Sequence, residues 1–279
     1  EQTFLQEEMG IVPEFVRASL DAQETSYIDK NEETGQILVI VDYPEQDRES
    51  SRKMTSYITL PVGVILLEGC IVTIANQSNT TVQMLESGKI KDLDTRYKTR
   101  FLLQVLLLIS QEYLAYLRQI EKQSTLIEQR LYKSMKNREL IHMLELDKSL
   151  VYFSTSLKGD ELTLKKIMRF KDIPLYEEDE DLLEDVMIEI KQAIEMSEIY
   201  SNINSRTSEG FLKCHQQQYE RDHEAADRYY HCHVHSQYGV RVLRNECDRP
   251  SGSLCLVSHG GLHYSFDPLL GLFREKFPL

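Results

Sequence analysis

Acidic side chains give the first indication of chemistry in this sequence of 279 residues. The run Glu177-Glu178-Asp179-Glu180-Asp181 opens a stretch with helical spacing, in which Asp185 and Glu189 follow four residues apart. Mg²⁺ takes oxygen ligands and keeps several of its waters, so one or two carboxylates on each side of a site are enough to hold it. Negative charge also complements the start of a helix, so a solvated acidic face is the alternative interpretation.

Histidine and cysteine form a second group, since residues 212–279 hold seven of the eight His and four of the five Cys. Zn²⁺ favours such ligands in tetrahedral sets, but no paired C-x₂-C spacing frames them. A Ser, a His and an Asp further along are the residue types of a nucleophilic triad, yet no strand–turn–helix elbow surrounds the serine. We therefore expect neither a zinc site nor an enzyme. The residues concerned are Cys214, His215, His231, Cys232, His233, His235, Cys247, Cys255, Ser258, His259 and Asp267.

The net charge of −13 disfavours nucleic acid and anionic membrane as partners, and it suits divalent cations or basic proteins. Residues 212–279 hold eight basic and eight acidic residues, so all of this charge lies in residues 1–211, where 24 basic residues face 37 acidic ones. No stretch has the roughly 18–20 uncharged apolar residues of a membrane span. The chain opens on Glu1 rather than Met, and we expect an N-terminal truncation.

Residues 1–94 have the pattern of a small α/β domain. We predict a short helix over Ile11 to Leu20, a buried strand over Gln36 to Asp42, a hairpin of Tyr57 to Leu67 with Cys70 to Ala75, and helical spacing from Thr80 to Ile90. Cys70 and His142, the Cys and His that precede the tail, are ordinary structural residues in this interpretation, as expected in a reducing compartment.

Residues 95–176 predict two long antiparallel helices that turn near Asn137 and end before Pro174, with a coiled-coil-like arm as the result. The pattern of the second helix is carried by Leu140, Leu144, Val151, Leu157 and Leu164. Residues 177–211 then predict a stalk helix whose apolar side carries Val186, Ile190, Ile194, Ile199 and Ile203.

The order of these elements resembles the CorA family of magnesium transporters, in its shorter-domain bacterial branch. The resemblance rests on Phe4 to Ile11, Tyr57 to Leu66 and Cys70 to Ile74, and most closely on Phe101 to Phe211 with Gln119-Ile-Glu-Lys122. It implies an α/β/α cytosolic domain, two antiparallel helices and a stalk that leads into the membrane. It also implies a homopentamer at the cytoplasmic side of the cell membrane, around a pore that this chain lacks.

The resemblance further implies a regulatory Mg²⁺ between subunits, whose loss lets the assembly splay and open. Asp185 lies where the family's stalk carries its metal-binding aspartate, and Glu189 is a second candidate ligand one turn later. The partner aspartate of the first helix falls at or near Ala18, after Arg17, so Asp21 would have to substitute. The preferred ion among Mg²⁺, Co²⁺ and Ni²⁺ stays open.

The family's signature Gly-Met-Asn and its membrane spans are missing after Phe211, and a disordered tail is expected there. Permitted codons for Val240 to Asp248, read one nucleotide later, give Phe-Gly-Phe-Tyr-Gly-Met-Asn-Val. With permitted codons, the same offset from Lys213 can give a stalk-like end followed by an apolar run. We interpret the tail as the product of a frameshift near Phe211. The alternatives are a soluble helical scaffold that binds a protein partner, and a zinc-binding protein that uses the tail.

Overall fold

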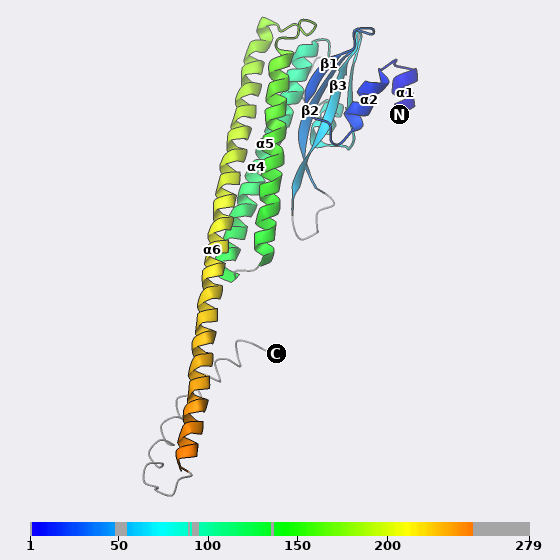
Figure 1. Cartoon of the computed structure of the whole chain (residues 1–279). Coiled ribbons are helices and arrows are strands. Elements are labelled where there is room, and N and C mark those ends of the chain that lie inside the picture. Colours follow the sequence, from blue (N-terminus) through cyan, green and yellow to red (C-terminus); the bar gives the residue numbers. More distant parts are fainter. Residues whose placement is uncertain (1, 48–54, 89, 91–94, 135–136, 248–279) are drawn as a thin grey trace. The chain divides into compact units, whose positions relative to one another are not determined.

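A computed structural model describes residues 2–47, 55–88, 90, 95–134 and 137–247 of the chain. The chain divides into two units, Glu1–Lys213 and Cys214–Leu279. The first unit contains a sheet and most of the helices (Figure 1), and the candidate residues Asp21, Asp185 and Glu189 all belong to it.

The sheet has four antiparallel strands in sequence order: β1 (Tyr27–Lys30), β2 (Ile37–Gln46), β3 (Tyr57–Leu66) and β4 (Ile71–Ala75). The predicted hairpin at Glu68-Gly69 is confirmed, because the Leu67 N–H donates to the Cys70 carbonyl at 3.0 Å and the strands on either side pair. β1 was not predicted, since its four residues are too few to show an alternating pattern.

Successive side chains of a strand point to opposite faces, and both faces of this sheet are covered. Leu38 and Ile40 face α2 (Pro13–Leu20), where they form a buried cluster with Phe15 and Val16 of that helix. The alternate residues of β2, from Ile37 to Tyr43, belong to a larger core that α4 and α5 supply. Figure 1 shows the sheet between these two helical layers, which confirms the predicted α/β/α arrangement.

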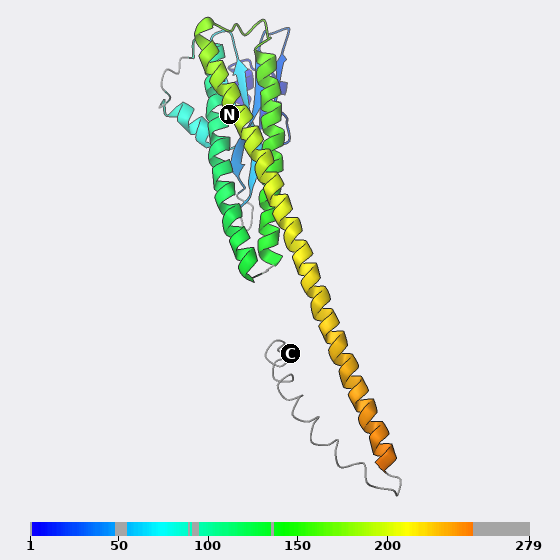
Figure 2. The same ribbon diagram turned by 90° about the vertical axis from the view of Figure 1, so that its left-hand side faces the viewer.

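The two long helices are α4 (Lys98–Ser134) and α5 (Asn137–Ile167), joined near Asn137 as predicted and running antiparallel (Figure 2). The apolar residues whose spacing predicted α5 do not all lie in the core. Leu157 and Leu164 are buried, whereas Leu144 and Val151 are 53% and 52% exposed. α5 lies against both α4 and the sheet, so it buries a different side, through Met143, Leu146, Leu150, Phe153, Leu157, Leu164 and Ile167.

A short 3₁₀ helix, η1 (Glu177–Asp179), leads into α6 (Glu180–Cys247). Of the residues that marked the predicted stalk helix, Val186 and Ile190 are buried, whereas Ile199 and Ile203 are 54% and 51% exposed. Two shorter helices complete the first unit: α1 (Gln2–Glu7), which was not predicted, and α3 (Thr80–Glu86), which ends earlier than the predicted Ile90.

Within the second unit, α6 is helical from Cys214 to Cys247, where the sequence predicted a disordered tail. Helix-forming residues such as Gln216, Gln217, Ala225 and Ala226 are frequent there and favour this conformation. Residues 248–279, with Cys255, Ser258, His259 and Asp267, lie outside the described residues. In the part of the chain that the structure describes, no helix is long and apolar enough to cross a membrane.

Candidate functional site

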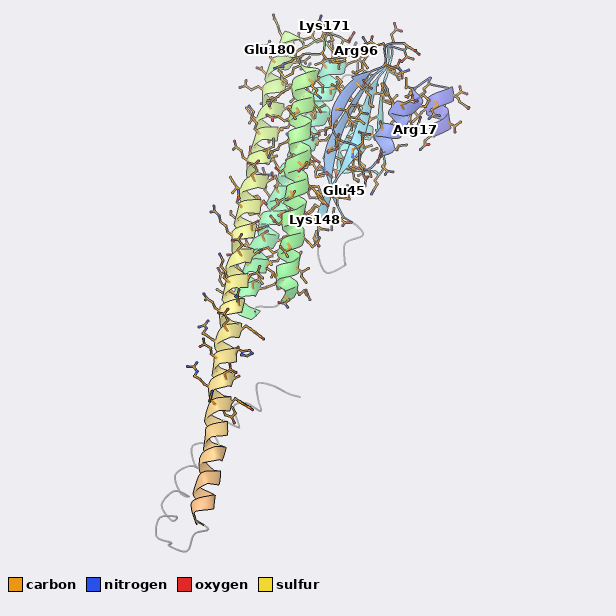
Figure 3. The ribbon with its side chains drawn as sticks, in the orientation of Figure 1. Arg17, Glu45, Arg96, Lys148, Lys171 and Glu180 are labelled. Atoms are coloured by element: carbon orange, nitrogen blue, oxygen red, sulfur yellow. The ribbon has the colours of Figure 1, made fainter. Side chains whose placement is uncertain are left out.

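The acidic run before α6 has one buried member, which fixes the start of this helix. Asp179 is 3% exposed, and its Oδ1 lies 3.5 Å from Nε of Arg100 on α4. Glu177, Glu178, Glu180 and Asp181 are exposed, and Figure 3 shows Glu180 at the first turn. One carboxylate of the run is therefore structural, and it sets the direction in which the later carboxylates of α6 project.

Asp185 and Glu189 lie one turn apart on α6, so their side chains share a face of the helix. Asp185 is exposed and Glu189 is partly buried, while Val186 and Ile190 are buried on the other side. Ile188, between them, is 54% exposed. The two predicted ligands therefore face away from the core of their own chain.

Asp21 is the residue that ends α2, and its side chain is exposed. Its Oδ1 accepts a hydrogen bond from the Gln23 N–H at 3.0 Å, which closes the turn after the helix. Ala18 is partly buried against the core beneath α2. Arg17 is exposed on α2 (Figure 3) and pairs with Glu14 of the same helix. Asp21 can thus offer one carboxylate oxygen outwards.

Asp21 and Asp185 are not brought together within one chain. α2 covers one face of the sheet, whereas α6 packs on the helices that cover the other face (Figure 1). Among the described residues, no group of three or more His, Cys, Asp or Glu side chains is placed to hold a metal ion. A metal site that used both aspartates would have to form between two copies of the chain.

A close contact positions α2, and with it Asp21. Ser19 of α2 is fully buried, and its hydroxyl donates to the Phe15 carbonyl at 2.8 Å. Gly63 of β3 lies directly beneath, where a Cβ would stand 2.0 Å from the Ser19 oxygen. Such a distance is well inside van der Waals contact, so only glycine lets the helix approach the strand this closely.

Polar side chains hold the part of α6 from Ser197 to Ser208 against α5. The sequence did not predict this contact. Asp147 of α5 accepts hydrogen bonds from the hydroxyls of Ser201 and Ser205, at 2.7 and 3.3 Å. Lys158 of α5 pairs with Glu198 at 2.5 Å. The serines are spaced four residues apart, so both reach the same carboxylate. This spacing was visible in the sequence, but its partner, 54 residues away, was not.

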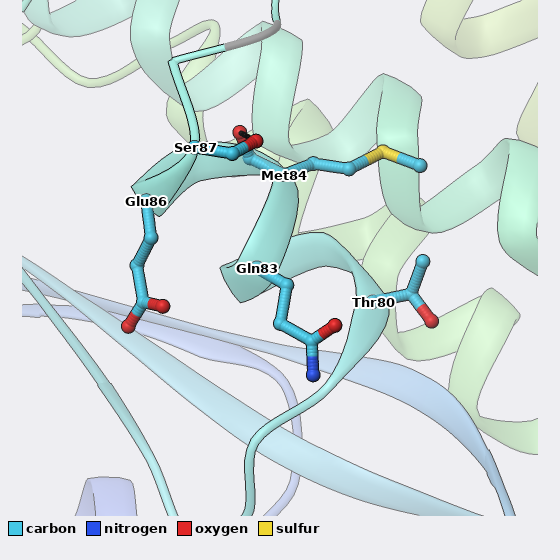
Figure 4. Close-up of a pocket in the computed structure, with 5 residues that line it drawn as sticks. All are labelled: Thr80, Gln83, Met84, Glu86 and Ser87. Atoms are coloured by element: carbon cyan, nitrogen blue, oxygen red, sulfur yellow. Dashed lines mark hydrogen bonds between the residues drawn. The ribbon is translucent and has the colours of Figure 1, made fainter.

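An open hollow lies on α3 and is lined by Thr80, Gln83, Met84, Glu86 and Ser87. Figure 4 shows that the side chains of Met84 and Glu86 point away from each other. Glu86 is the one carboxylate of this lining, so the hollow does not gather the oxygen ligands that a divalent cation requires.

The residues of the predicted zinc alternative belong to the second unit, which begins at Cys214. Cys214 is an exposed free cysteine, and His223 is 3.6 Å from Asp227 on the same helix face. His231 is exposed, and the side chains from residue 232 onwards lie outside the described residues. Cys70 and His142 are the Cys and His that precede the tail. Cys70 is an exposed free cysteine in the turn before β4. Burial lowers the pKa of His142.

A family model described as the CorA-like Mg²⁺ transporter protein matches residues 1–221. The chain belongs to this family. The match covers the sheet, the helical arm and the part of α6 that carries Asp185 and Glu189. No curated protein matches the chain.

Solved structures share this CorA fold at low sequence identity. The soluble domain of CorA from Methanocaldococcus jannaschii is 23% identical, with a TM-score of 0.63 over 74% of this chain and 80% of that one. The complete CorA magnesium transporter of the same organism is 18% identical, with a TM-score of 0.71 over 99% and 84%. The ZntB cytoplasmic domain from Vibrio parahaemolyticus is 10% identical, with a TM-score of 0.60 over 76% and 82%. At these identities the likeness establishes the fold.

Proposed function

We propose that this CorA-family chain is the Mg²⁺-sensing and gating portion of a divalent-cation channel, and that it works as a homopentamer. The observation that carries the proposal is the outward position of Asp185 and Glu189 on α6, on the other side of the sheet from Asp21. An ion between the Asp185 of one copy and the Asp21 of the next would use carboxylates that the single chain leaves exposed. Mg²⁺ with most of its waters retained fits such a two-sided site.

Exposed apolar residues on the long helices support self-association. Leu144 and Val151 of α5, and Ile199 and Ile203 of α6, are more than half exposed in the single chain, as are Leu162 and Ile188. The first four belong to the apolar sets whose spacing predicted these two helices. Large apolar side chains exposed along two neighbouring helices are available for an interface. Packing between copies of the chain would bury them.

Charge explains how ion occupancy would control the assembly. Residues 1–211 carry the whole net charge of −13, so five copies around one axis repel one another. Bound Mg²⁺ at each interface would offset this repulsion and hold a symmetric, closed arrangement. Loss of the ion would let the copies separate, so ion occupancy biases an equilibrium between two arrangements.

Sedimentation velocity of the full chain, with and without Mg²⁺, tests this proposal. We expect a weak pentamer or a monomer without the ion, and a shift towards pentamer as Mg²⁺ is added. Asp185→Asn should raise the Mg²⁺ concentration at half-assembly by about tenfold, the effect of losing on the order of 1.4 kcal/mol per site. Glu195→Gln is the matched control, because this exposed residue of α6 undergoes the same change in charge away from the predicted site.

Two outcomes would support other functions. A stable monomer or dimer that does not respond to Mg²⁺ would contradict the proposal and favour a helical scaffold for a protein partner. Stoichiometric zinc that survives dialysis would favour the zinc-binding alternative through the tail. A response to Mg²⁺ that Asp185→Asn leaves unchanged would show that the ligands lie elsewhere, with Glu189 and Asp21 the next substitutions to make.

We also propose that the chain beyond Phe211 is read one nucleotide out of frame. The family match ends at residue 221, ten residues after Phe211, which agrees with a loss of family character near this point. The nucleotide sequence decides the matter. Codons from Lys213 to Asp248 that cannot encode an apolar run and Gly-Met-Asn at the one-nucleotide offset would contradict it.

A further inference from the structure

Two carboxyl groups lie buried between the sheet and α5. Asp42 of β2 is 8% exposed, and Asp160 of α5 is 1% exposed. The Oδ1 of Asp160 accepts a hydrogen bond from the backbone N–H of Asp42 at 2.9 Å, and another from the Ser26 hydroxyl at 2.7 Å. Asp160 therefore joins α5 to β2 and to the segment before β1.

The other oxygens of this pair are not satisfied. Asp42 Oδ1 and Asp160 Oδ2 are both buried, and neither has a hydrogen-bond donor among the described residues. A buried carboxylate oxygen without a donor is costly, because it loses its water and gains nothing in return. Two such oxygens on neighbouring carboxyls indicate that something else supplies the missing donor or positive charge.

The side chains around the pair offer hydroxyl groups but no cation. The Tyr113 hydroxyl of α4 donates to the Asp42 backbone carbonyl at 3.2 Å. The Ser156 hydroxyl of α5 lies within hydrogen-bond reach of the Asp42 carboxyl and of the Thr59 hydroxyl of β3, which is 2.9 Å away, and its one proton can serve only one of these acceptors at a time. Glu112 of α4 adds further negative charge near Tyr113. Among the described residues, no Lys, Arg or His side chain acts on either aspartate.

Burial raises the pKa of both carboxyls, since the charged form is disfavoured away from water. The negative charge of Asp42 raises the pKa of Asp160 further, while the hydrogen bonds from the Asp42 N–H and from Ser26 act in the opposite direction. Burial also raises the pKa of Tyr113 well above its ordinary value, so its hydroxyl keeps its proton.

We propose that Asp42 and Asp160 form a buried proton-binding site, which holds one proton at neutral pH and links pH to the packing of α5 on β2. A proton on Asp160 Oδ2 or on Asp42 Oδ1 turns one unsatisfied acceptor into a donor and leaves a single negative charge in the site. Release of this proton to solvent leaves two buried charges with no cation beside them, and these charges push α5 and β2 apart. This inference is independent of Mg²⁺ sensing.

The sign of the pH effect follows from the raised pKa. Between the ordinary pKa of an aspartate, about 3.9, and the raised value, the folded chain binds a proton that the unfolded chain has lost. The contribution of this pair to stability is therefore largest below the window and falls as pH rises through it. The unfolding equilibrium constant should increase by up to about tenfold per pH unit for this one proton.

Urea unfolding of the full chain between pH 6 and pH 9 tests the proposal with Asp160→Asn. Asparagine keeps an acceptor for Ser26 and for the Asp42 N–H, and its amide group supplies a permanent donor where Oδ2 stood. We expect the wild-type chain to lose stability as pH rises, and the variant to lose most of this dependence. Asp147→Asn is the matched control, because Asp147 also lies on α5 and accepts two hydrogen bonds, yet is only partly buried.

Infrared spectra of the wild-type chain in D₂O give a second readout that does not require a variant to fold. A protonated carboxylic acid has a C=O stretch distinct from that of carboxylates, and we expect this band to persist at pH 8. It should disappear in Asp160→Asn or Asp42→Asn. It should remain in Glu112→Gln, which removes another carboxyl whose pKa burial raises.

Three results would overturn the proposal. The first is the absence of the acid band at neutral pH. The second is an equal pH dependence in the wild-type chain and in Asp160→Asn. The third is a stabilisation of the wild-type chain at pH 8 by Na⁺ or Mg²⁺, without an acid band and lost in Asp160→Asn, which would show that the pair holds a cation instead of a proton.

Discussion

Two successive parts of α6 contact the helical arm in different ways. The upper part buries Leu183, Val186, Ile190 and Ala193 in the same core as α4 and α5. The lower part, from Ser197 to Ser208, buries small polar residues and forms the hydrogen bonds to Asp147. The upper contact is stabilised by apolar burial. The hydrogen bonds of the lower contact mainly fix the orientation of α6 on α5, because each adds only about 1 kcal/mol net to stability.

This difference bears on how a signal would pass along α6. The upper part, with Asp185 and Glu189 on its outer face, is anchored to the body that would bind the ion. The lower part is held by side chains that exchange partners at little cost, so this part of the helix can change its contacts with α5 while the upper part stays in place. Three substitutions test the contrast, in order of decreasing effect.

The largest effect is expected for Ile190→Ala in the upper part. Ile190 is 1% exposed, and its truncation should lower the free energy of unfolding by about 3 kcal/mol, through lost burial and the cavity that remains. Urea unfolding measures this change. Ile188→Ala, at a position 54% exposed, is the control and should stay within about 0.5 kcal/mol of the wild type. Equal changes in the free energy of unfolding at the two positions would contradict the claim that apolar burial stabilises the upper part of α6.

A smaller effect is expected for Asp147→Ala in the lower part. It removes the acceptor of both serine hydroxyls and should cost about 1–2 kcal/mol. Since the chain is strongly acidic, loss of a negative charge partly offsets this cost. A double-mutant cycle with Ser201→Ala removes that contribution and should give a coupling energy of about 1 kcal/mol. A coupling near zero would mean that this hydrogen bond does not hold α6.

The smallest effect is expected for the pair of Lys158 and Glu198, whose side chains are 52% and 49% exposed. Exposed ion pairs contribute about 0.2–1 kcal/mol and weaken as salt screens them. Glu198→Gln should therefore change stability by a few tenths of a kcal/mol at low salt and by nothing measurable at high salt. A large effect that salt does not alter would place this pair among the main contacts of the lower part.

The sequence predicted the order and type of most elements, since these depend on local patterns. Pro13 near the first turn of a helix, the hairpin at Glu68-Gly69 and the turn near Asn137 each left a signal that the structure confirms. β1 was missed, because four residues with the sequence Tyr-Ile-Asp-Lys carry no clear alternation. Asp185 and Glu189 remain predictions as metal ligands, and the structure adds that both lie on the outward face of α6.

The buried face of each long helix was harder to predict. Both α5 and α6 carry apolar residues on more than one side, so periodicity alone could not choose between Leu144 and Val151 on one side and Leu146 and Leu150 on the other. The choice depends on where the sheet and α4 lie. An exposed apolar residue and a core residue look the same in the sequence. The apolar residues that stay exposed are those proposed to form the interface between copies of the chain.

By itself, the sequence determined the order of most elements of the first unit and its acidic charge, because composition, periodicity and order along the chain are local or additive properties. The layers of this unit were implied by the resemblance to the CorA family. Only the tertiary structure decided which carboxylates are buried. Asp179 meets Arg100, and Asp42 meets Asp160 across 118 residues of sequence. Such pairs arise where strands and helices cross, and the free energy of a buried charge depends on every group around it, which no sequence spacing encodes.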